Sequence, residues 1–349
     1  KFKNGLYVGK FVAYHKGHQN CINMFSNLCE KLKVVLCTKP SDRIPGNVRK
    51  QWLMQDIKQN KFNEIHQPQN IELFHLVEDN IPLYPEGLTQ WCNEIKDLTG
   101  NFDIMFGNED YVVDCANFFR SEYLIPDMSR VKHNVSSTKI LDNQLKYYDL
   151  LTTAAKSYFN KVVVIAGSEQ TGKTTMAKNL AKEFKGVHIE EYGRTFMENE
   201  ILKEGLHGLS DWTVKEYENV AIHHSNLVRE TLKKPVKLAF VDSDPLITEV
   251  YSNLYIRESS QELKNLIHSE KNDFTAVLAS EGTSLNLESS EYFNKFQIQG
   301  KKLVNREFFT EYLKFSLDYY KKEYIEFSNS NGFDKRMDHV IDEISKRFN

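Results

Sequence analysis

Short apolar runs followed by a glycine-bearing loop and then by a helix-period segment occur twice in the chain. The first run is Leu6–Gly9, which leads through a loop to His18 and to a helix ending at Leu28. The second run is Val162–Ala166, which precedes a loop and a helix over Lys173–Phe184. A buried strand, a glycine loop and an amphipathic helix form the opening unit of α/β nucleotide-binding domains. The pattern therefore predicts one such domain on each run.

Further apolar runs predict that the first domain is a parallel, doubly wound sheet. Its expected strands are Leu32–Thr38, Ile71–Val77, Phe102–Phe106 and Tyr123–Ile125, and its expected helices include Arg49–Gln59 and Leu88–Leu98. Apolar residues recur at helical spacing from Thr138 to Tyr158, which predicts one long helix leading out of this domain. We expect the first domain to span residues 1–150 and the second to span residues 151–349.

The second domain repeats the alternation of strands and helices. Its expected strands are Val187–Glu191, Lys237–Asp242 and Thr275–Ala279, and its expected helices are Val214–Lys233 and Asp334–Phe348. Between them, Ser280–Lys302 is polar and lacks periodicity, and a connection of this length is typical of a lid or a binding loop. The predicted fold class is therefore α/β, with two doubly wound parallel-sheet domains.

Composition excludes several classes of partner. The 349 residues include 45 Lys and Arg against 48 Asp and Glu, and residues 1–150 are balanced at 18 of each sign. Neither domain has the basic excess that attracts nucleic acid or an anionic membrane. No apolar run approaches the ~20 residues that span a bilayer, and the five cysteines form no C-x-x-C pair. We expect a cytoplasmic protein with reduced thiols, no nucleic-acid partner and no membrane insertion.

The loop Gly167–Thr174 fits G-x-x-x-x-G-K-[ST] at every fixed position and lies between a predicted strand and a predicted helix. In such a loop, backbone N–H groups surround phosphate oxygens, the lysine neutralises them, and the hydroxyl ligates Mg²⁺. We therefore expect ATP binding, with Lys173 as a catalytic cation and Thr174 as a metal ligand; a plain glycine-rich turn is the alternative. The expected ATP contacts are Gly167, Ser168, Gln170, Thr171, Gly172, Thr174 and Thr175.

Two clusters beyond this loop are candidates for the phosphoryl-acceptor site. Residues Glu190–Arg194 follow one predicted strand, where a carboxylate could take a proton from a substrate hydroxyl. Residues Asp242–Asp244 end another strand, where an acidic residue typically holds the metal. Each carboxylate could instead be a solvated residue at a loop end. The candidates are Glu191, Arg194 and Asp242 as catalytic residues, Asp242 also as a metal ligand, and Tyr192 and Asp244 as substrate contacts.

The loop after the first strand is a second candidate phosphate site, because His15 and His18 flank Gly17 just ahead of a helix. Two imidazoles and a helix N-terminus can stabilise charge on an α-phosphate, which suits nucleotidyl transfer. Metal binding is the rival use, but no third ligand stands at a suitable spacing. The segment Val135–Ile140 adds hydroxyls and a lysine, although S-S-T-K is also a common helix cap. The candidate phosphate contacts are Gly9, Phe11, Gly17, Ser136, Ser137, Thr138 and Lys139, with His15 and His18 as catalytic residues.

Together, G-x-F-x-x-x-H-x-G-H at Gly9–His18 and V-S-S-T-K-I at Val135–Ile140 resemble the H-x-G-H and I-S-S-T-x-x-R motifs of the nucleotidyltransferase superfamily. Followed by a P-loop module with E-Y-G-R at Glu191–Arg194, they resemble the NadR-type bifunctional family over essentially the whole chain. The resemblance implies a Rossmann-like nicotinamide-mononucleotide (NMN) adenylyltransferase over residues 1–150 and a P-loop ribosylnicotinamide kinase over residues 151–349.

In that family, the kinase phosphorylates nicotinamide riboside with ATP. The other domain then joins NMN to AMP from a second ATP, giving NAD and pyrophosphate, with Mg²⁺ as the cofactor. The resemblance further implies that Trp91 stacks on nicotinamide and that Arg49 contacts substrate. It leaves open a homo-oligomer and a functional link to a nicotinamide riboside transporter. We expect no room before Leu6 for the N-terminal helix-turn-helix that some members carry.

Three departures from the family pattern keep alternatives open. Ala13 replaces a proline of the first motif, Leu141 replaces the arginine of the second, and the W-x-D-D-G-x-R lid is not recognisable between Ser280 and Arg306. In the first domain, Lys16, Lys139 or Lys146 could replace the lost positive charge. In the lid, the cation could be Lys295, Lys301, Lys302 or Arg306. The alternatives are a single-activity nucleoside kinase with an inactive first domain and a nucleotide-sensing regulator.

Overall fold

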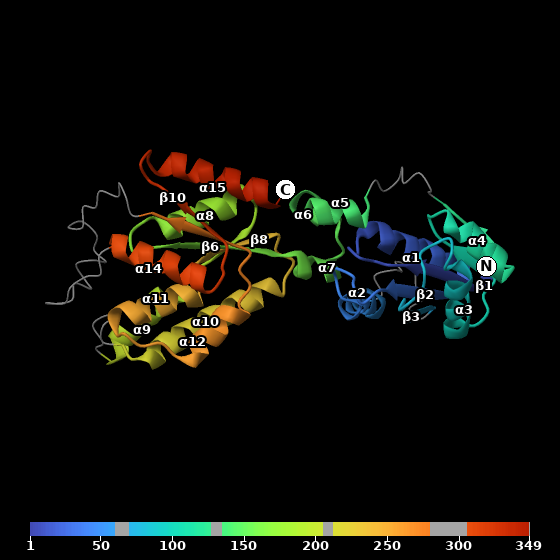
Figure 1. Ribbon diagram of the computed structural model, residues 1–349, viewed down its shortest axis with the longest axis horizontal. Coiled ribbons are helices and arrows are strands. Elements are labelled where there is room, and N and C mark those ends of the chain that lie inside the picture. Colours follow the sequence, from blue (N-terminus) through green and yellow to red (C-terminus); the bar gives the residue numbers. More distant parts are fainter. Residues whose placement is uncertain (60–69, 127–134, 205–211, 280–305, 349) are drawn as a thin grey trace. The chain divides into compact units, whose positions relative to one another are not determined.

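The computed structural model describes residues 1–59, 70–126, 135–204, 212–279 and 306–348. These residues form two compact units, Lys1–Tyr158 and Phe159–Phe348 (Figure 1). The division follows Tyr158, slightly beyond the boundary expected at residue 150. Within the described ranges, no helix has the length and apolar character required to cross a membrane.

The first unit is built on a five-stranded parallel sheet in the order β3-β2-β1-β4-β5. Because the strand order reverses at β1, the crevice beyond the carboxyl ends of β1 and β4 is the usual ligand position in such a sheet. The strands are β1 (Phe2–Gly9), β2 (Cys29–Thr38), β3 (Ile71–Val77), β4 (Ile104–Phe106) and β5 (Glu122–Leu124). The helices between them are α1 (Lys16–Leu28), α2 (Gly46–Lys58), α3 (Leu88–Thr99) and α4 (Tyr111–Phe119).

Helices pack on both faces of this first sheet. One face places Leu6 and Met105 against Cys92 of α3 and residues of α4. On the other face, the ring of Phe25 from α1 stacks on Phe106 with centroids 4.5 Å apart. Strands that are buried on both faces appear in the sequence as continuous apolar runs, and this is why the hydrophobic pattern located them.

The prediction of one long helix over residues 138–158 is wrong, because the chain there forms several short helices. The side chain of Asn143 accepts a hydrogen bond from Lys146 N at 3.1 Å, and that of Thr152 accepts one from Ala155 N at 3.3 Å. Each of these polar residues caps a new helix, which interrupts the old one. The pieces are α5 (Ser137–Asp142), α6 (Gln144–Tyr147), α7 (Thr153–Lys156) and 3₁₀ turns at Tyr148–Leu150 and Ser157–Phe159.

The second unit is also a five-stranded parallel sheet, in the order β10-β9-β6-β8-β7. Helices α8 and α15 cover one face, and α10, α11 and α14 cover the other (Figure 1). The strands are β6 (Lys161–Gly167), β7 (Val187–Ile189), β8 (Leu238–Asp242), β9 (Phe274–Leu278) and β10 (Tyr324–Phe327). The helices are α8 (Lys173–Glu183), α9 (Tyr192–Glu204), α10 (Val214–Leu232), α11 (Pro245–Tyr255), α12 (Gln261–Ser269), α14 (Arg306–Tyr319) and α15 (Phe333–Phe348).

Both units are therefore doubly wound α/β folds, as predicted. The hydrophobic pattern did not identify β10 or the helices α4, α9, α11, α12 and α14. In α11, every residue from Pro245 to Val250 is buried, including the polar residues Thr248 and Glu249. The lid predicted at Ser280–Lys302 lies outside the described residues.

Candidate functional sites

The loop between β6 and α8 has the backbone geometry that its two glycines allow. Gly167 has a φ of +145° and Gly172 a φ of +89°, and a Cβ on Gly167 would lie 2.7 Å from the carbonyl oxygen of Leu278. Within the loop, Lys173 Nζ and Thr171 Oγ1 donate to the carbonyl oxygen of Ser168 at 3.0 and 2.9 Å. The loop is therefore a tightly closed turn, with Lys173 drawn across it.

Thr174 and Asp242, predicted from separate motifs as metal ligands, lie in direct contact. Thr174 Oγ1 donates to Asp242 Oδ2 at 2.5 Å. The other carboxylate oxygen, Oδ1, is buried and accepts no hydrogen bond from the part of the chain that the structure describes. A hydroxyl and a carboxylate are oxygen donors of the kind that Mg²⁺ prefers. The donor set therefore fits a hard cation such as Mg²⁺.

Glu191 lies between β7 and α9, among the charges of the P-loop. Burial raises the pKa of the Glu191 carboxyl, while the positive charge of Lys173 opposes this rise and the negative charge of Asp242 adds to it. Arg194, which is exposed in the first turn of α9, also acts on Glu191 through its charge. The neighbouring Glu190 instead pairs with Lys178 at 3.5 Å. A carboxyl with a raised pKa beside a lysine is a good candidate for proton transfer.

Two other predicted substrate contacts participate in local structure. The carboxylate of Asp244 accepts a hydrogen bond from Ile247 N at 3.0 Å and so caps α11, and burial raises the pKa of this carboxyl. The ring of Tyr192 stacks on His223 with centroids 5.0 Å apart. Asp244 therefore stabilises the start of a helix, and a contact of either residue with substrate stays a prediction.

Sequence reasoning missed two buried polar residues that support this site. His224 of α10 contacts the backbone at both candidate acceptor clusters, through Tyr192 N and the carbonyl oxygen of Ser243. Arg336 of α15 donates to the carbonyl oxygens of Thr171 and Ala279 at 3.1 and 3.2 Å. Both residues lie on the buried, otherwise mostly apolar face of an amphipathic helix. A polar residue at such a position is the feature of the sequence that could have identified them.

Arg306, one of the candidate lid cations, lies at the start of α14. Its guanidinium donates to Gln170 Oε1 of the P-loop at 3.2 Å. This contact brings a positive charge to the loop from the far end of the sequence. The other candidate lid cations, Lys295, Lys301 and Lys302, lie outside the described residues.

In the first unit, His15 and His18 form a stacked pair. Their ring centroids are 3.8 Å apart with 23° between the planes, and His18 Nδ1 accepts a hydrogen bond from His15 N at 3.5 Å. Gly17 lies directly against this pair, because a Cβ there would be 2.9 Å from Cε1 and Nδ1 of His15. Across the described ranges, no group of three or more His, Cys, Asp or Glu residues could hold a metal ion. Binding of phosphate by the two imidazoles stays a prediction.

The second predicted motif of this unit packs against the first. Ala13 N donates to Ser137 Oγ at 3.3 Å, and Ser136 Oγ accepts from Lys139 N at 3.2 Å as the cap of α5. Thr138 and Lys139 are exposed beside these two serines. The S-S-T-K sequence therefore forms a helix cap, which was the alternative interpretation, and it also contacts the histidine loop.

Arg49 acts as a structural brace for the histidine loop. Its side chain is fully buried, donates to the carbonyl oxygen of Lys10 at 2.6 Å and forms an ion pair with Asp42. Although burial works against ionisation, hydrogen bonds from Lys39 N and Arg49 hold the pKa of Asp42 below its ordinary value. Arg49 does not line the adjoining pocket.

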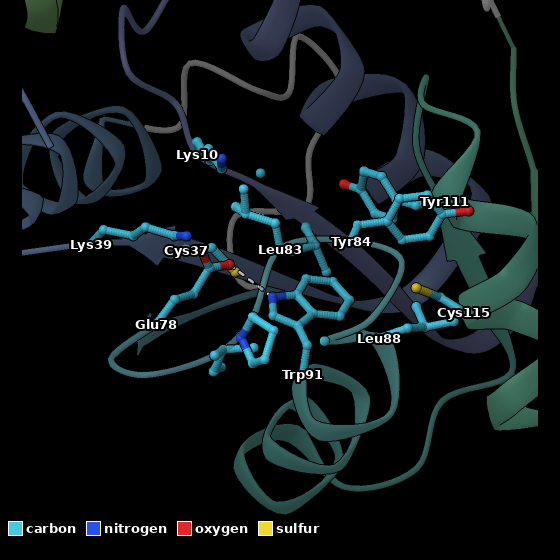
Figure 2. Close-up of a pocket in the computed structure, with 15 residues that line it drawn as sticks. Lys10, Cys37, Lys39, Glu78, Leu83, Tyr84, Leu88, Trp91, Tyr111 and Cys115 are labelled. Carbon is cyan, nitrogen blue, oxygen red and sulfur yellow. Dashed lines mark hydrogen bonds between the residues drawn. The ribbon is translucent and has the colours of Figure 1, made fainter. Parts of the chain in front are cut away.

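That pocket lies beside the carboxyl end of β1 and contains Trp91, as Figure 2 shows. Trp91 Nε1 donates to Glu78 Oε1 at 2.8 Å, and its ring meets Tyr111 edge-on with centroids 5.9 Å apart. Lys10 and Lys39 also line the pocket. Aromatic walls with a few fixed polar groups suit a flat heteroaromatic ligand, and the lysines suit an attached anion.

Comparisons with known proteins agree with this architecture. A family model described as an AAA domain matches residues 162–331. The trifunctional NAD biosynthesis/regulator protein NadR of Escherichia coli (strain K12) is 23% identical over 295 residues, which cover 78% of this chain and 68% of the relative. The protein of the same name from Salmonella typhimurium is 24% identical, with the same coverage.

Two solved structures match nearly the whole chain. A NadR protein in complex with NR has a TM-score of 0.73 at 20% identity and covers 99% of this chain and 96% of its own. A NadR protein in complex with NAD and AMP-PNP has a TM-score of 0.72 at 21% identity and covers 100% and 96%. The fold thus defines a protein of two doubly wound α/β units, and the second carries the sequence motif of a P-loop. Over most of its length, the chain is similar in sequence and in fold to proteins named NadR.

Proposed function

We propose that the chain is a bifunctional enzyme of NAD biosynthesis that makes NMN from nicotinamide riboside and then NAD from NMN. The observation that carries this proposal is the position of two separate candidate phosphate loops, each at the carboxyl end of the central strand of its own sheet. The loop after β1 contains the stacked histidines, and the loop after β6 is the P-loop. Two NadR structures match both units together, covering 99% and 100% of this chain.

In the second unit, the proposed reaction transfers the γ-phosphoryl group of ATP to the 5′-hydroxyl of nicotinamide riboside. Lys173 and the P-loop N–H groups hold the phosphates, while Glu191 accepts the proton of the attacking hydroxyl. Arg194 stabilises charge on the transferred group. Thr174 and Asp242 would hold Mg²⁺, which would supply positive charge to offset the negative charge of the phosphates.

In the first unit, the NMN phosphate attacks the α-phosphorus of a second ATP, and pyrophosphate leaves. His15 and His18 stabilise the developing charge, and Ser136, Thr138 and Lys139 at the start of α5 hold the leaving phosphates. The pocket around Trp91 holds the nicotinamide ring. Because the attack is direct, positioning and charge stabilisation are sufficient and no covalent intermediate with the protein forms.

A pair of variants of the full chain tests this division of labour. Lys173→Ala should abolish phosphorylation of nicotinamide riboside while NMN is still converted to NAD. His18→Ala should have the opposite effect. Product formation from each substrate, with ATP and Mg²⁺, would be followed by chromatography. If either variant lost both activities, or neither, the assignment of the two reactions to the two units would be wrong.

One observation favours a second candidate, a nucleoside kinase with an inactive first unit. Leu141 occupies the position of an arginine in the family that the chain resembles, so the second motif lacks one positive charge. Supplying NMN directly separates the two proposals, because only an active first unit then yields NAD. The stacked His15 and His18 favour the bifunctional enzyme.

A further inference from the structure

His224 is a polar side chain in the core of the second unit. It is 3% exposed and lies in α10 on the same buried face as Tyr217, Ala221 and Val228. A buried imidazole without hydrogen-bond partners would destabilise the fold by about 1–3 kcal/mol. Its two ring nitrogens therefore need partners, and both have them.

Those partners fix the protonation state of the ring. Tyr192 N can only donate, and its hydrogen bond to Nδ1 is 3.4 Å long. The carbonyl oxygen of Ser243 can only accept, and it lies 3.1 Å from Nε2. Nε2 must therefore carry the proton and Nδ1 must be free to accept, which is one neutral tautomer of histidine. Burial accordingly lowers the pKa of His224 to about 4.

The two partners belong to the segments that carry the candidate acceptor residues. Tyr192 directly follows Glu191, and Ser243 directly follows Asp242. Ser243 has a φ of +84°, a left-handed conformation that costs a residue with a Cβ on the order of 1–3 kcal/mol. The hydrogen bond from His224 to its carbonyl helps to hold this strained turn in place.

We propose that His224 is a positioning residue for phosphoryl transfer, because its ring joins the segment of Glu191 to that of Asp242 and so sets how the two carboxylates face the P-loop. This inference rests on the proposed kinase reaction. The ring itself contacts backbone atoms and acts through the two residues that it holds. A displacement of about 1 Å at such groups can lower a rate ~100-fold.

Three variants of the full chain test this role. His224→Leu removes both hydrogen bonds, and its kcat for riboside phosphorylation should fall ~100-fold, with a higher Mg²⁺ concentration at half-maximal rate. His224→Gln keeps a donor near the Nε2 position and His224→Asn keeps an acceptor near Nδ1, so each should regain part of the lost kcat. NMN adenylylation by the same chains should stay within about twofold of wild type. A purely structural role would lower the melting temperature without this graded order of kcat values.

His339→Asn is the matched control, because His339 is an exposed histidine of α15. It should leave both activities unchanged. Wild-type kcat in the Gln and Asn variants alike would overturn the role of His224, even if the Leu variant does not fold. A wild-type chain that fails to phosphorylate nicotinamide riboside would overturn the kinase proposal itself, so the two failures are distinguishable.

Discussion

Ala13 N donates a hydrogen bond to Ser137 Oγ at 3.3 Å, across 124 residues of sequence. Ala13 occupies the position of a proline in the family that the chain resembles, and proline has no N–H to donate. The departure from the motif therefore supplies the donor for a contact that a proline could not make. This hydrogen bond joins the histidine loop to the start of α5, so the two proposed ATP-binding segments support each other.

Ser137→Ala should lower the kcat/KM of NMN adenylylation by about 3- to 10-fold, which corresponds to the loss of one hydrogen bond. Initial rates of NAD formation at varied ATP would measure the effect. Riboside phosphorylation by the same chain is the internal control and should not change.

Ala13→Pro removes the same hydrogen bond from the donor side and leaves the Ser137 hydroxyl in place. An equal effect of the two substitutions, with no further loss in the double variant, would assign the loss to the hydrogen bond. A strong effect of Ser137→Ala alone would show that the hydroxyl acts directly on ATP, and would contradict a purely supporting role for Ser137.

Gly17→Ala should reduce adenylyl transfer by at least ~100-fold, which is the scale found when a charge-stabilising group is displaced. The added Cβ would lie 2.9 Å from two ring atoms of His15, so the imidazole must shift and its stacking on His18 is disturbed. NAD formation from NMN measures the loss, and the melting temperature of the first unit checks its fold. Near-normal activity would mean that the stacked arrangement is not required for the reaction.

The fold class could be predicted from sequence because the strands of both sheets are buried on two faces. Continuous apolar runs such as Val162–Ala166 are hard to mistake when a glycine loop and a helix follow. Helix α11 was missed although it directly follows the predicted strand at Asp242, because its first six residues, polar ones included, are all buried. The long helix over 138–158 was a misinterpretation, because apolar spacing continued across the capping residues Asn143 and Thr152.

The candidate sites were predictable where the chemistry lies in a contiguous motif. Lys173 and Thr174 follow from one octapeptide, whereas the contact of Thr174 with Asp242 depends on how β6 and β8 pair. His224 and Arg336 reach the site from helices that are distant in sequence. A single sequence does not show which residues they contact in the fold. Arg49 was predicted to contact substrate, but the structure places its guanidinium on Asp42 and the backbone of Lys10.

Trp91→Phe should raise the KM for NMN several-fold with little change in kcat, and Trp91→Ala should raise it further. Phenylalanine keeps an aromatic face but loses the hydrogen bond from Nε1 to Glu78, while alanine loses both. Steady-state kinetics at saturating ATP would separate KM from kcat. Unchanged KM in both variants would place nicotinamide elsewhere.

Arg336→Met should raise the KM for ATP in the kinase reaction about 10-fold, because the P-loop carbonyl of Thr171 loses its guanidinium partner. Arg336→Lys keeps the positive charge but loses the planar fork that reaches both carbonyl oxygens, and it should be intermediate. The exposed neighbour Lys335 provides the control substitution, Lys335→Met. Equal KM values for the Met and Lys variants and wild type would show that the P-loop holds its conformation without this contact.

The rate of riboside phosphorylation should fall with decreasing pH at a midpoint above 4.5, the ordinary value for a glutamate. Burial raises the pKa of Glu191, and the proposed base is active as the carboxylate, so activity is lost as pH falls through the raised pKa. Glu191→Gln should lower kcat by ~100-fold or more and remove this acidic limb from the pH profile.

Stability should respond to pH in the opposite sense, because a raised carboxyl pKa means that ionisation of Glu191 destabilises the folded state. The protonated Glu191 side chain therefore contributes fully to stability below pH 4.5, the ordinary pKa of a glutamate. This contribution is lost as the pH rises through the raised pKa of the folded state. Glu191→Gln should therefore melt at or above the wild-type temperature at about pH 8 and show no gain below about pH 4.5. An acidic limb that survives in this variant would assign proton transfer to another group.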